Sequence, residues 1–166
     1  MADELPSLVD RVKAAHRNYP TGITVITTTI DGEPYGLAVN AFSSVSLDPP
    51  TVLFCVNESS KTHVHLVNSD HVGINVLGRA QHDVASVFAT SGGDKFSQIE
   101  WETGTMGVPV ITGAAAQFEV RVDQQHKVGT HTVFICEVVD ARVSDDEPLL
   151  YYRSAFIDGR HLTEHM

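Results

Sequence analysis

Short segments rich in β-branched residues, each bounded by turn signals, recur along this chain and predict a mainly β fold. Residues 22–30 (GITVITTTI) favour the pleated surface of a sheet, Asp31-Gly32 is typical of a hairpin turn, and residues 34–41 return as a second strand. Further strand-like segments lie at 43–47, 51–57, 72–77, 117–122 and 131–143, and the last segment, 148–157, is apolar and aromatic. Because they do not alternate with helices as βαβα units, an antiparallel barrel is predicted rather than a Rossmann sheet.

Helices and burial patterns complete the local predictions. Helices are predicted over 5–18, 62–68 and 80–90. The nearly continuous apolar run 51–57 predicts a strand that is buried on both faces. In the first of the two long strands near the end of the chain, alternation predicts that Gln117, Glu119 and Arg121 lie on a solvated face.

The composition fits a single globular domain over residues 1–166, because 42% of the residues are hydrophobic and 19% are charged. A formal charge of -10 argues against nucleic acid and membrane surfaces as general partners. No apolar run approaches the length of about 18 residues that a transmembrane helix needs, and Met1 to Pro6 does not read as a signal peptide. Cys55 and Cys136 lack CxxC spacing and are expected to be buried, reduced thiols. A cytoplasmic enzyme is therefore predicted.

Four polar segments are candidates for ligand contacts. Residues 40–50 leave an accessible backbone beside hydroxyl groups, which suits the edge of a flat heterocycle, and residues 58–62 combine hydroxyls and a lysine before a predicted helix, which suits an anion. Residues 94–96 place a lysine beside an aromatic ring, and residues 127–131 present a histidine after a glycine turn. Each segment also has an ordinary structural interpretation: a polar strand end, an N-cap, a solvated loop charge or a surface hairpin histidine.

Several catalytic and metal-binding motifs are absent from the sequence. There is no GxGxxG, P-loop or GxSxG motif, so a nucleotide must be held by other means and a serine hydrolase is not favoured. His63 and His65 are two residues apart, a spacing that misaligns them on the predicted helix, and no HExxH motif is present. No metal ion is predicted.

Taken in this order, the segments resemble the flavin reductase-like family, whose fold is the FMN-binding split barrel. The matching segments are PTGITVITT (20–28), NAFSSVSLDPPTVLFCV (40–56), SSKTH (59–63), INVL (74–77), FAT and DKF within 88–96, GTH (129–131) and PLLYYRSAF (148–156). The match runs from about residue 15 to residue 158. Each segment is weak alone, whereas their order and spacing together are specific.

The resemblance implies a Greek-key split β-barrel with a few short helices and a homodimer that binds flavin near the subunit interface. It also implies a function. FMN or FAD would be reduced by NADH or NADPH through hydride transfer to flavin N5, and the reduced flavin would diffuse to a partner monooxygenase. An FMN-binding electron carrier of the same fold is the alternative.

The resemblance also implies which residues form the site. They are, along the flavin ring, Asn40, Ala41, Ser43, Ser44 and Val45; at the flavin phosphate, Ser59, Ser60, Lys61 and Thr62; in a further flavin-contacting loop, Lys95 and Phe96; near the nicotinamide, His131, the one candidate catalytic residue; and in the C-terminal part of the pocket, Tyr152 and Arg153. The sequence departs from the family pattern twice, with Thr130 where aspartate is common and Ser154 where glycine is usual.

Overall fold

The protein is described here by a computed structural model that covers residues 6–158. Its elements, in chain order, are α1 (Leu8–His16), β1 (Thr21–Gly22), β2 (Thr24–Ile30), β3 (Glu33–Val39), β4 (Phe42–Leu47), β5 (Pro50–Asn57), α2 (His63–Leu66), β6 (His71–Val76), α3 (His82–Ala89), the 3-10 helix η1 (Phe96–Gln98), β7 (Trp101–Thr103), β8 (Pro109–Ile111), β9 (Ala116–Val128), β10 (His131–Val143), β11 (Leu149–Tyr152) and β12 (Ala155–Asp158). Most of Met1 to Pro6 and residue 5 of the predicted first helix lie outside the described residues.

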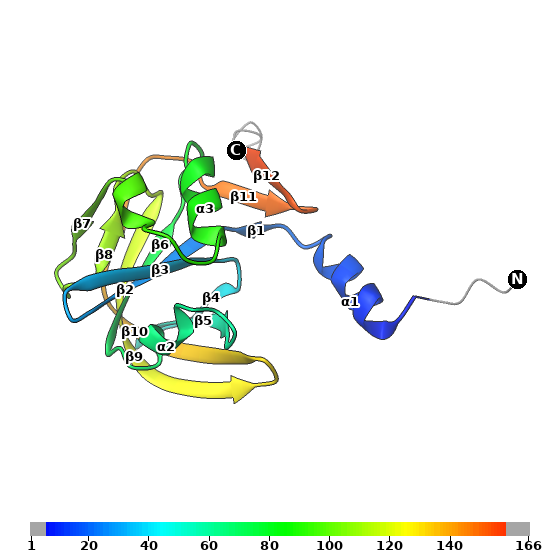
Figure 1. The fold of residues 1–166 in the computed structure, drawn as a ribbon, viewed down its shortest axis with the longest axis horizontal. Helices are drawn as coiled ribbons and strands as arrows, with labels where there is room; N and C mark the ends of the chain where they lie inside the picture. The colour runs from blue at the N-terminus through cyan, green and yellow to red at the C-terminus, as the bar shows by residue number, and fades with distance from the viewer. Residues whose placement is uncertain (1–5, 159–166) are drawn as a thin grey trace, which may run out of the picture.

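Seven strands form one antiparallel sheet in the order β3-β2-β6-β9-β10-β5-β4 (Figure 1). The two edge strands, β3 and β4, are consecutive in the chain and are joined by Asn40 and Ala41. The sheet therefore curls until its edges meet at this corner, where the Cys55 backbone N–H donates to the Ala41 carbonyl at 2.9 Å. The predicted antiparallel, mainly β fold is confirmed.

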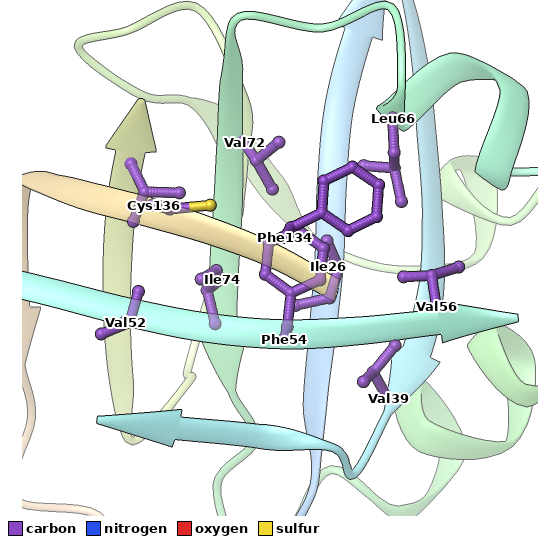
Figure 2. Close-up of a cluster of buried hydrophobic side chains, with 11 residues drawn as sticks. Ile26, Val39, Val52, Phe54, Val56, Leu66, Val72, Ile74, Phe134 and Cys136 are labelled. Carbon is purple, nitrogen blue, oxygen red and sulfur yellow. The ribbon is translucent and has the colours of Figure 1, made fainter. Parts of the chain in front are cut away.

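The interior of the curled sheet is filled by apolar side chains from most of its strands (Figure 2). Phe54 on β5 and Phe134 on β10 stack with their ring centroids 4.8 Å apart, and both are completely buried. Ile26 and Ile74 pack against them from β2 and β6, and Leu66 of α2 closes one end. Truncating either phenylalanine to alanine would cost about 3–5 kcal/mol, so this cluster fixes the scaffold on which the site is built.

Both cysteines are free thiols, as predicted. Cys136 belongs to the core cluster and is fully buried. Burial, helped by the negative charge of Asp123, raises the pKa of the Cys136 thiol to about 12. Cys55 is only partly buried, and desolvation raises its thiol pKa as well.

Two burial predictions are wrong. In β5, Val52, Phe54 and Val56 are buried, whereas the residues between them are only partly covered, so one face of the strand is left open. Glu119 was expected on a solvated face but is 2% exposed. Its carboxylate accepts hydrogen bonds from the backbone N–H groups of Thr105, at 2.9 Å, and of Met106, at 2.6 Å, so a distant loop covers it.

The first helix, α1, stands away from the barrel in Figure 1. Ser7 caps it by accepting from the Asp10 backbone N–H at 3.2 Å, but none of its residues is buried. Leu8, Val9 and Val12 on this helix are exposed. No helix within residues 6–158 is long and apolar enough to span a membrane.

Candidate active site

A cavity of about 490 Å³ lies at the corner where the two sheet edges meet, and is called the corner cavity below. Its walls come from β1, from the ends of β2, β4 and β6, from the link between β3 and β4, and from the open face of β5. The lining residues are Tyr19, Thr21, Gly22, Thr24, Asn40, Ala41, Phe42, Ser43, Leu53, Cys55 and Val76. The combination of an apolar floor with an amide and hydroxyls at the rim suits a flat, partly polar ring.

The shape of the corner cavity follows from the alternation of side chains in β5. Because Val52 and Phe54 point into the core, Leu53 and Cys55 must point to the opposite face, and they become the apolar floor of the cavity. The pairing of β4 with β5 shifts register after Ser44, which bends the rim strand at this point.

A second cavity, of about 330 Å³, lies further along the β3 edge and is called the lysine cavity. Leu37 and Ala38 of β3 line it, together with residues 59–62, residues 88–92 and Lys95. It therefore gathers all four residues predicted to contact a phosphate. None of the described residues lines both cavities, but residues 37–38 of the lysine cavity and residues 40–41 of the corner cavity are close together in the chain, on either side of the end of β3.

The hydroxyl groups of this segment mainly hold the loop in shape. The Ser59 hydroxyl donates to Asn57 Oδ1 at 2.9 Å, and the Thr62 hydroxyl donates to the Gly36 carbonyl at 3.2 Å. The Thr62 backbone N–H donates to Ser60 Oγ at 3.3 Å. The Lys61 ammonium has no hydrogen-bond or ion-pair partner within residues 6–158, so it is available to an anion.

Lys95 approaches the same cavity from the segment before η1. Its Nζ donates to the carbonyls of Gly36, at 3.2 Å, and Phe88, at 3.4 Å, and lies 5.6 Å from the centroid of the Phe88 ring. Burial lowers the pKa of Lys95. A partly desolvated ammonium beside the free ammonium of Lys61 attracts an anionic group, and phosphate is the anion that such a lysine pair suits best.

His131 is the first residue of β10 and pairs with Asn57 across the sheet. The Thr130 hydroxyl lies 3.0 Å from His131 Nδ1, so a hydroxyl contacts the imidazole where the family commonly has a carboxylate. The Glu58 backbone N–H donates to the Thr130 carbonyl at 3.0 Å, which ties this hairpin to the start of the 59–62 segment. His131 itself is exposed and lines neither cavity.

Arg153 lines a third cavity, of about 370 Å³, which shares Asn40, Ala41 and two further residues with the corner cavity. Its guanidinium donates to Asn18 Oδ1 at 2.9 and 3.2 Å and lies 5.2 Å from the Tyr152 ring centroid. Arg153 and Ser154 both have positive φ, of 50° and 64°. Glycine at the second position, as in the family pattern, would avoid the strain of a side chain there.

Besides His131, four predicted site residues line none of the three cavities described above. Ser44 and Val45 are exposed on β4 beyond the corner cavity, and Tyr152 supports Arg153 without lining the third cavity. Phe96 is 8% exposed and packs edge-on against Phe88, so it anchors the Lys95 segment in the core. Phe96 also lines a further cavity beside the lysine cavity.

Sequence reasoning also missed several lining residues. Leu53 and Cys55 were counted as core, although alternation from Phe54 would have assigned them to the opposite face. Gly92, with φ of 81°, lines the lysine cavity from a loop in which no periodic pattern exists.

The comparisons with known proteins identify the family. The profile of the Flavin reductase like domain matches residues 16–160. The chain belongs to this flavin reductase-like family. The match covers every cavity described above.

Two relatives with similar sequences are named as reductases. "FMN reductase (NADH) SmoA" of Agrobacterium fabrum is 42% identical over 138 residues, which cover 83% of this chain and 79% of the relative. The reductase component of a 4-nitrophenol and 4-nitrocatechol monooxygenase of Rhodococcus opacus is 38% identical over 148 residues, which cover 87% of this chain and 80% of that protein.

Solved structures of flavin reductases have the same fold. The NADH:FAD oxidoreductase SgcE6 of Streptomyces globisporus, in complex with NAD and FAD fragments, superposes with a TM-score of 0.87 at 35% identity, covering 93% of this chain and 95% of that one. BorF, the flavin reductase component of a bacterial two-component tryptophan halogenase, superposes with a TM-score of 0.84 at 30% identity. The superposition covers 90% of this chain and 97% of BorF. The predicted flavin reductase-like family and its fold are confirmed.

Proposed function

We propose that this flavin reductase-like protein uses NADH to reduce FMN or FAD and releases the reduced flavin to a partner monooxygenase. The observation that carries the proposal is the pair of cavities on either side of the end of β3. The corner cavity has an apolar floor and a polar rim, and the lysine cavity beside it holds two ammonium groups. NADH is proposed rather than NADPH because the relatives SmoA and SgcE6 are named for NADH.

The residues present fit a flavin. Leu53 and Cys55 offer an apolar surface to one face of a ring, and the Asn40 amide and Ser43 hydroxyl offer donors and acceptors at its edge. The fit at the phosphate end rests on Lys95, a partly buried cation whose two bonds go to neutral carbonyls, so its charge is not balanced there. An anion in the lysine cavity supplies the missing countercharge.

When bound, the two cofactors would supply the hydride transfer, from nicotinamide C4 to flavin N5. The chain would hold them in position. The floor of the corner cavity fixes the plane of the ring, and the 59–62 segment with Lys95 fixes the phosphate, so the ring cannot rotate in its plane. The Asn40 amide and the Ser43 hydroxyl, which line the corner cavity, are proposed to stabilise negative charge at the pyrimidine edge of the ring.

We propose that the nicotinamide binds beside His131, with Arg153, supported by Tyr152, at the approach. His131 is exposed, and the Thr130 hydroxyl contacts its Nδ1. This contact orients the imidazole ring and leaves Nε2 as the nitrogen that can meet a ligand. The Arg153 guanidinium is held over Tyr152 and by Asn18, which presents a fixed cation beside Asn40 and Ala41.

A homodimer is part of the proposal, and its support comes from α1 and β4 more than from the C-terminal segment. Leu149 in that segment is fully buried inside its own protomer. By contrast, α1 buries none of its residues, and Val45 and Leu47 on the edge strand β4 are 53% and 88% exposed. Apolar surface of this kind marks an association site. Light scattering should give a dimer; a fully active monomer at micromolar concentration would remove the shared site.

The reaction is placed in the cytoplasm, where the free thiols Cys55 and Cys136 remain reduced. The test is NADH-dependent bleaching of added flavin at about 450 nm, where oxidised flavins absorb. Many turnovers per protein with FMN or FAD support a reductase. Bleaching that stops at one equivalent supports the alternative, a tightly bound electron carrier, and absence of flavin binding contradicts both. Running FMN, FAD and riboflavin in parallel ranks the three substrates.

A further inference from the structure

The segment proposed to hold the flavin phosphate, residues 59–62, is called the phosphate segment below, and it is attached at both of its ends to the hairpin between β9 and β10. Before the segment, the Glu58 backbone N–H donates to the Thr130 carbonyl at 3.0 Å. After the segment, His63 Nε2 and the Thr132 hydroxyl are hydrogen-bonded at 2.8 Å. These two bonds, called the clasp, join the phosphate segment to one hairpin.

The clasp brackets His131. Its two attachment points on the hairpin, Thr130 and Thr132, are the neighbours of His131 in the chain. The Thr130 hydroxyl also lies 3.0 Å from His131 Nδ1, so one of the two attachment points contacts the imidazole itself. An ion pair between Lys127 and Glu58, at 2.7 Å, adds to the first attachment, but it is exposed and contributes little. The position of His131 is therefore linked to that of the phosphate segment.

The bond between His63 and Thr132 is the half of the clasp that side chains make, and it is shielded from water. Side chains alternate along β10, so Thr132 and Phe134 point to the buried face, whereas His131 points to the opposite face. Thr132 is 6% exposed, and the His63 ring meets the Phe134 ring edge-on with the centroids 6.4 Å apart. Removing either partner leaves a polar atom of the other without its bond in this shielded place, which weakens the attachment.

The helix that follows the phosphate segment, α2, depends on such contacts. It is a single turn, too short to be stable alone, and Thr62 makes no side-chain hydrogen bond that caps it. Leu66 anchors its far end in the core (Figure 2), and His65 stacks on Tyr35 of β3 with the ring centroids 3.5 Å apart. At the end where the phosphate segment enters the helix, His63 is the residue that fixes it to β10.

We propose that the clasp couples the phosphate site to His131 and that His63 is the positioning residue of this coupling. The inference rests on the proposed function, which places the flavin phosphate in the lysine cavity. An anion there orders the phosphate segment, since Lys61 has no partner of its own within residues 6–158. The bond between His63 and Thr132 transmits this order to the hairpin that carries His131. A flavin that bears a phosphate therefore improves the use of NADH, which is a coupling between two sites.

Steady-state kinetics of the full chain with saturating FMN or saturating riboflavin measure the coupling. In the wild type, the KM for NADH should be lower with FMN than with riboflavin by about 3-fold to about 10-fold, the effect of one hydrogen bond. Thr132→Val removes the hydroxyl but keeps a branched side chain, and it should raise the KM with FMN to the value with riboflavin. His63→Ala should do the same. Thr132→Ser keeps the hydroxyl and should retain the difference between the two flavins.

A purely structural role of the clasp gives a different result. Fewer correctly folded molecules lower kcat and leave the KM for NADH unchanged, and that pattern in Thr132→Val would overturn the proposal. A wild-type KM that is the same with both flavins would overturn it as well. Thr51→Val is the matched control, because the Thr51 hydroxyl donates to the Pro49 carbonyl on the far side of β5 and lines none of the cavities. This variant should show the wild-type difference, and its loss there would also count against the clasp.

Hydrogen exchange of the backbone amides, followed by NMR, tests the clasp without NADH. Relative to riboflavin, FMN should slow exchange within residues 129–133 by about 3-fold to about 10-fold in the wild type, and should not do so in His63→Ala. If a protein that does not oxidise NADH shows this protection, the clasp stands and the proposed function fails. If FMN protects residues 59–62 but leaves 129–133 unchanged in the wild type, the coupling is overturned, whether or not the protein reduces flavin.

Discussion

Replacing Lys61 with alanine should weaken FMN binding and leave riboflavin binding nearly unchanged. Lys61 is exposed and lines the lysine cavity, and its Nζ lies 3.6 Å from the point where a Cβ on Gly92 would stand. Lys95, on the other side of the cavity, is tied to two backbone carbonyls, whereas Lys61 has no partner within residues 6–158. Removing Lys61 therefore changes the charge of the cavity with little effect on the fold.

The magnitude follows from the exposure of this lysine. A charge-assisted contact contributes about 1.5–3 kcal/mol when it is well shielded from water. Because Lys61 is exposed and screened, we expect about 1–2 kcal/mol, which raises the Kd for FMN by about 5-fold to about 30-fold. Riboflavin has no phosphate, so its Kd should change by less than about 2-fold.

Fluorescence titration of FMN and of riboflavin with the wild type and with Lys61→Ala gives the change in Kd for each flavin. Arg121→Ala is the control for loss of one exposed positive charge, because Arg121 lies on β9 and lines none of the cavities. Raising the salt concentration should reduce the difference between wild type and Lys61→Ala for FMN. Equal weakening of FMN and riboflavin would refute the reasoning, because it would mean that the phosphate lies elsewhere.

Four further predictions concern other parts of the molecule. His131→Ala should lower kcat/KM for NADH by about 10-fold to about 100-fold with flavin affinity retained, and Thr130→Asp should improve NADH use; lost flavin binding instead would put the histidine on the wrong side of the ring. Glu119→Ala should lower the free energy of unfolding by about 2–4 kcal/mol in urea, because it strands two backbone N–H groups, and an unchanged midpoint would contradict their dependence on this carboxylate. Ser154→Gly should raise stability by up to about 1 kcal/mol in thermal unfolding by relieving a positive φ, and a lower Tm would argue against strain there. Above pH 9.0 the stability should fall, because the Cys136 thiol ionises near its ordinary value of 9.0 when unfolded but only near about 12 when folded; this contribution is complete below pH 9.0 and lost toward pH 12, and an equally steep fall in Cys136→Ala would rule it out.

The strands and their turns were predictable because their signals are local. Asp31 and Gly32 form the expected turn between β2 and β3, with φ of 53° and 84°, and the long antiparallel strands follow from β-branched alternation. The burial of Glu119 was not predictable in this way. Its partners, Thr105 and Met106, come from a loop without periodicity, so only the tertiary structure brings the carboxylate and the N–H groups together.

The site was predictable in part, through the resemblance to the family rather than through periodicity. The residues at 59–62 and Lys95 do line one cavity, and Asn40, Ala41 and Ser43 line its neighbour. Leu53 and Cys55, which form the floor of the corner cavity, were missed. They belong to a continuous apolar run, and such a run has the same sequence pattern whether its second face packs against protein or against a ligand. The Tyr35–His65 pair joins elements 30 residues apart, and no local pattern predicts that contact.

The most direct test of the central claim is whether the protein delivers reduced flavin that is free in solution. Catalytic amounts of the protein are kept with NADH and excess FMN on one side of a dialysis membrane under anaerobic conditions, and reduced flavin is measured on the other side. The account predicts that reduced FMN crosses the membrane in large excess over the protein and that the total formed equals the NADH consumed. Reduction limited to one equivalent that stays with the protein would contradict it, and would indicate an electron carrier instead.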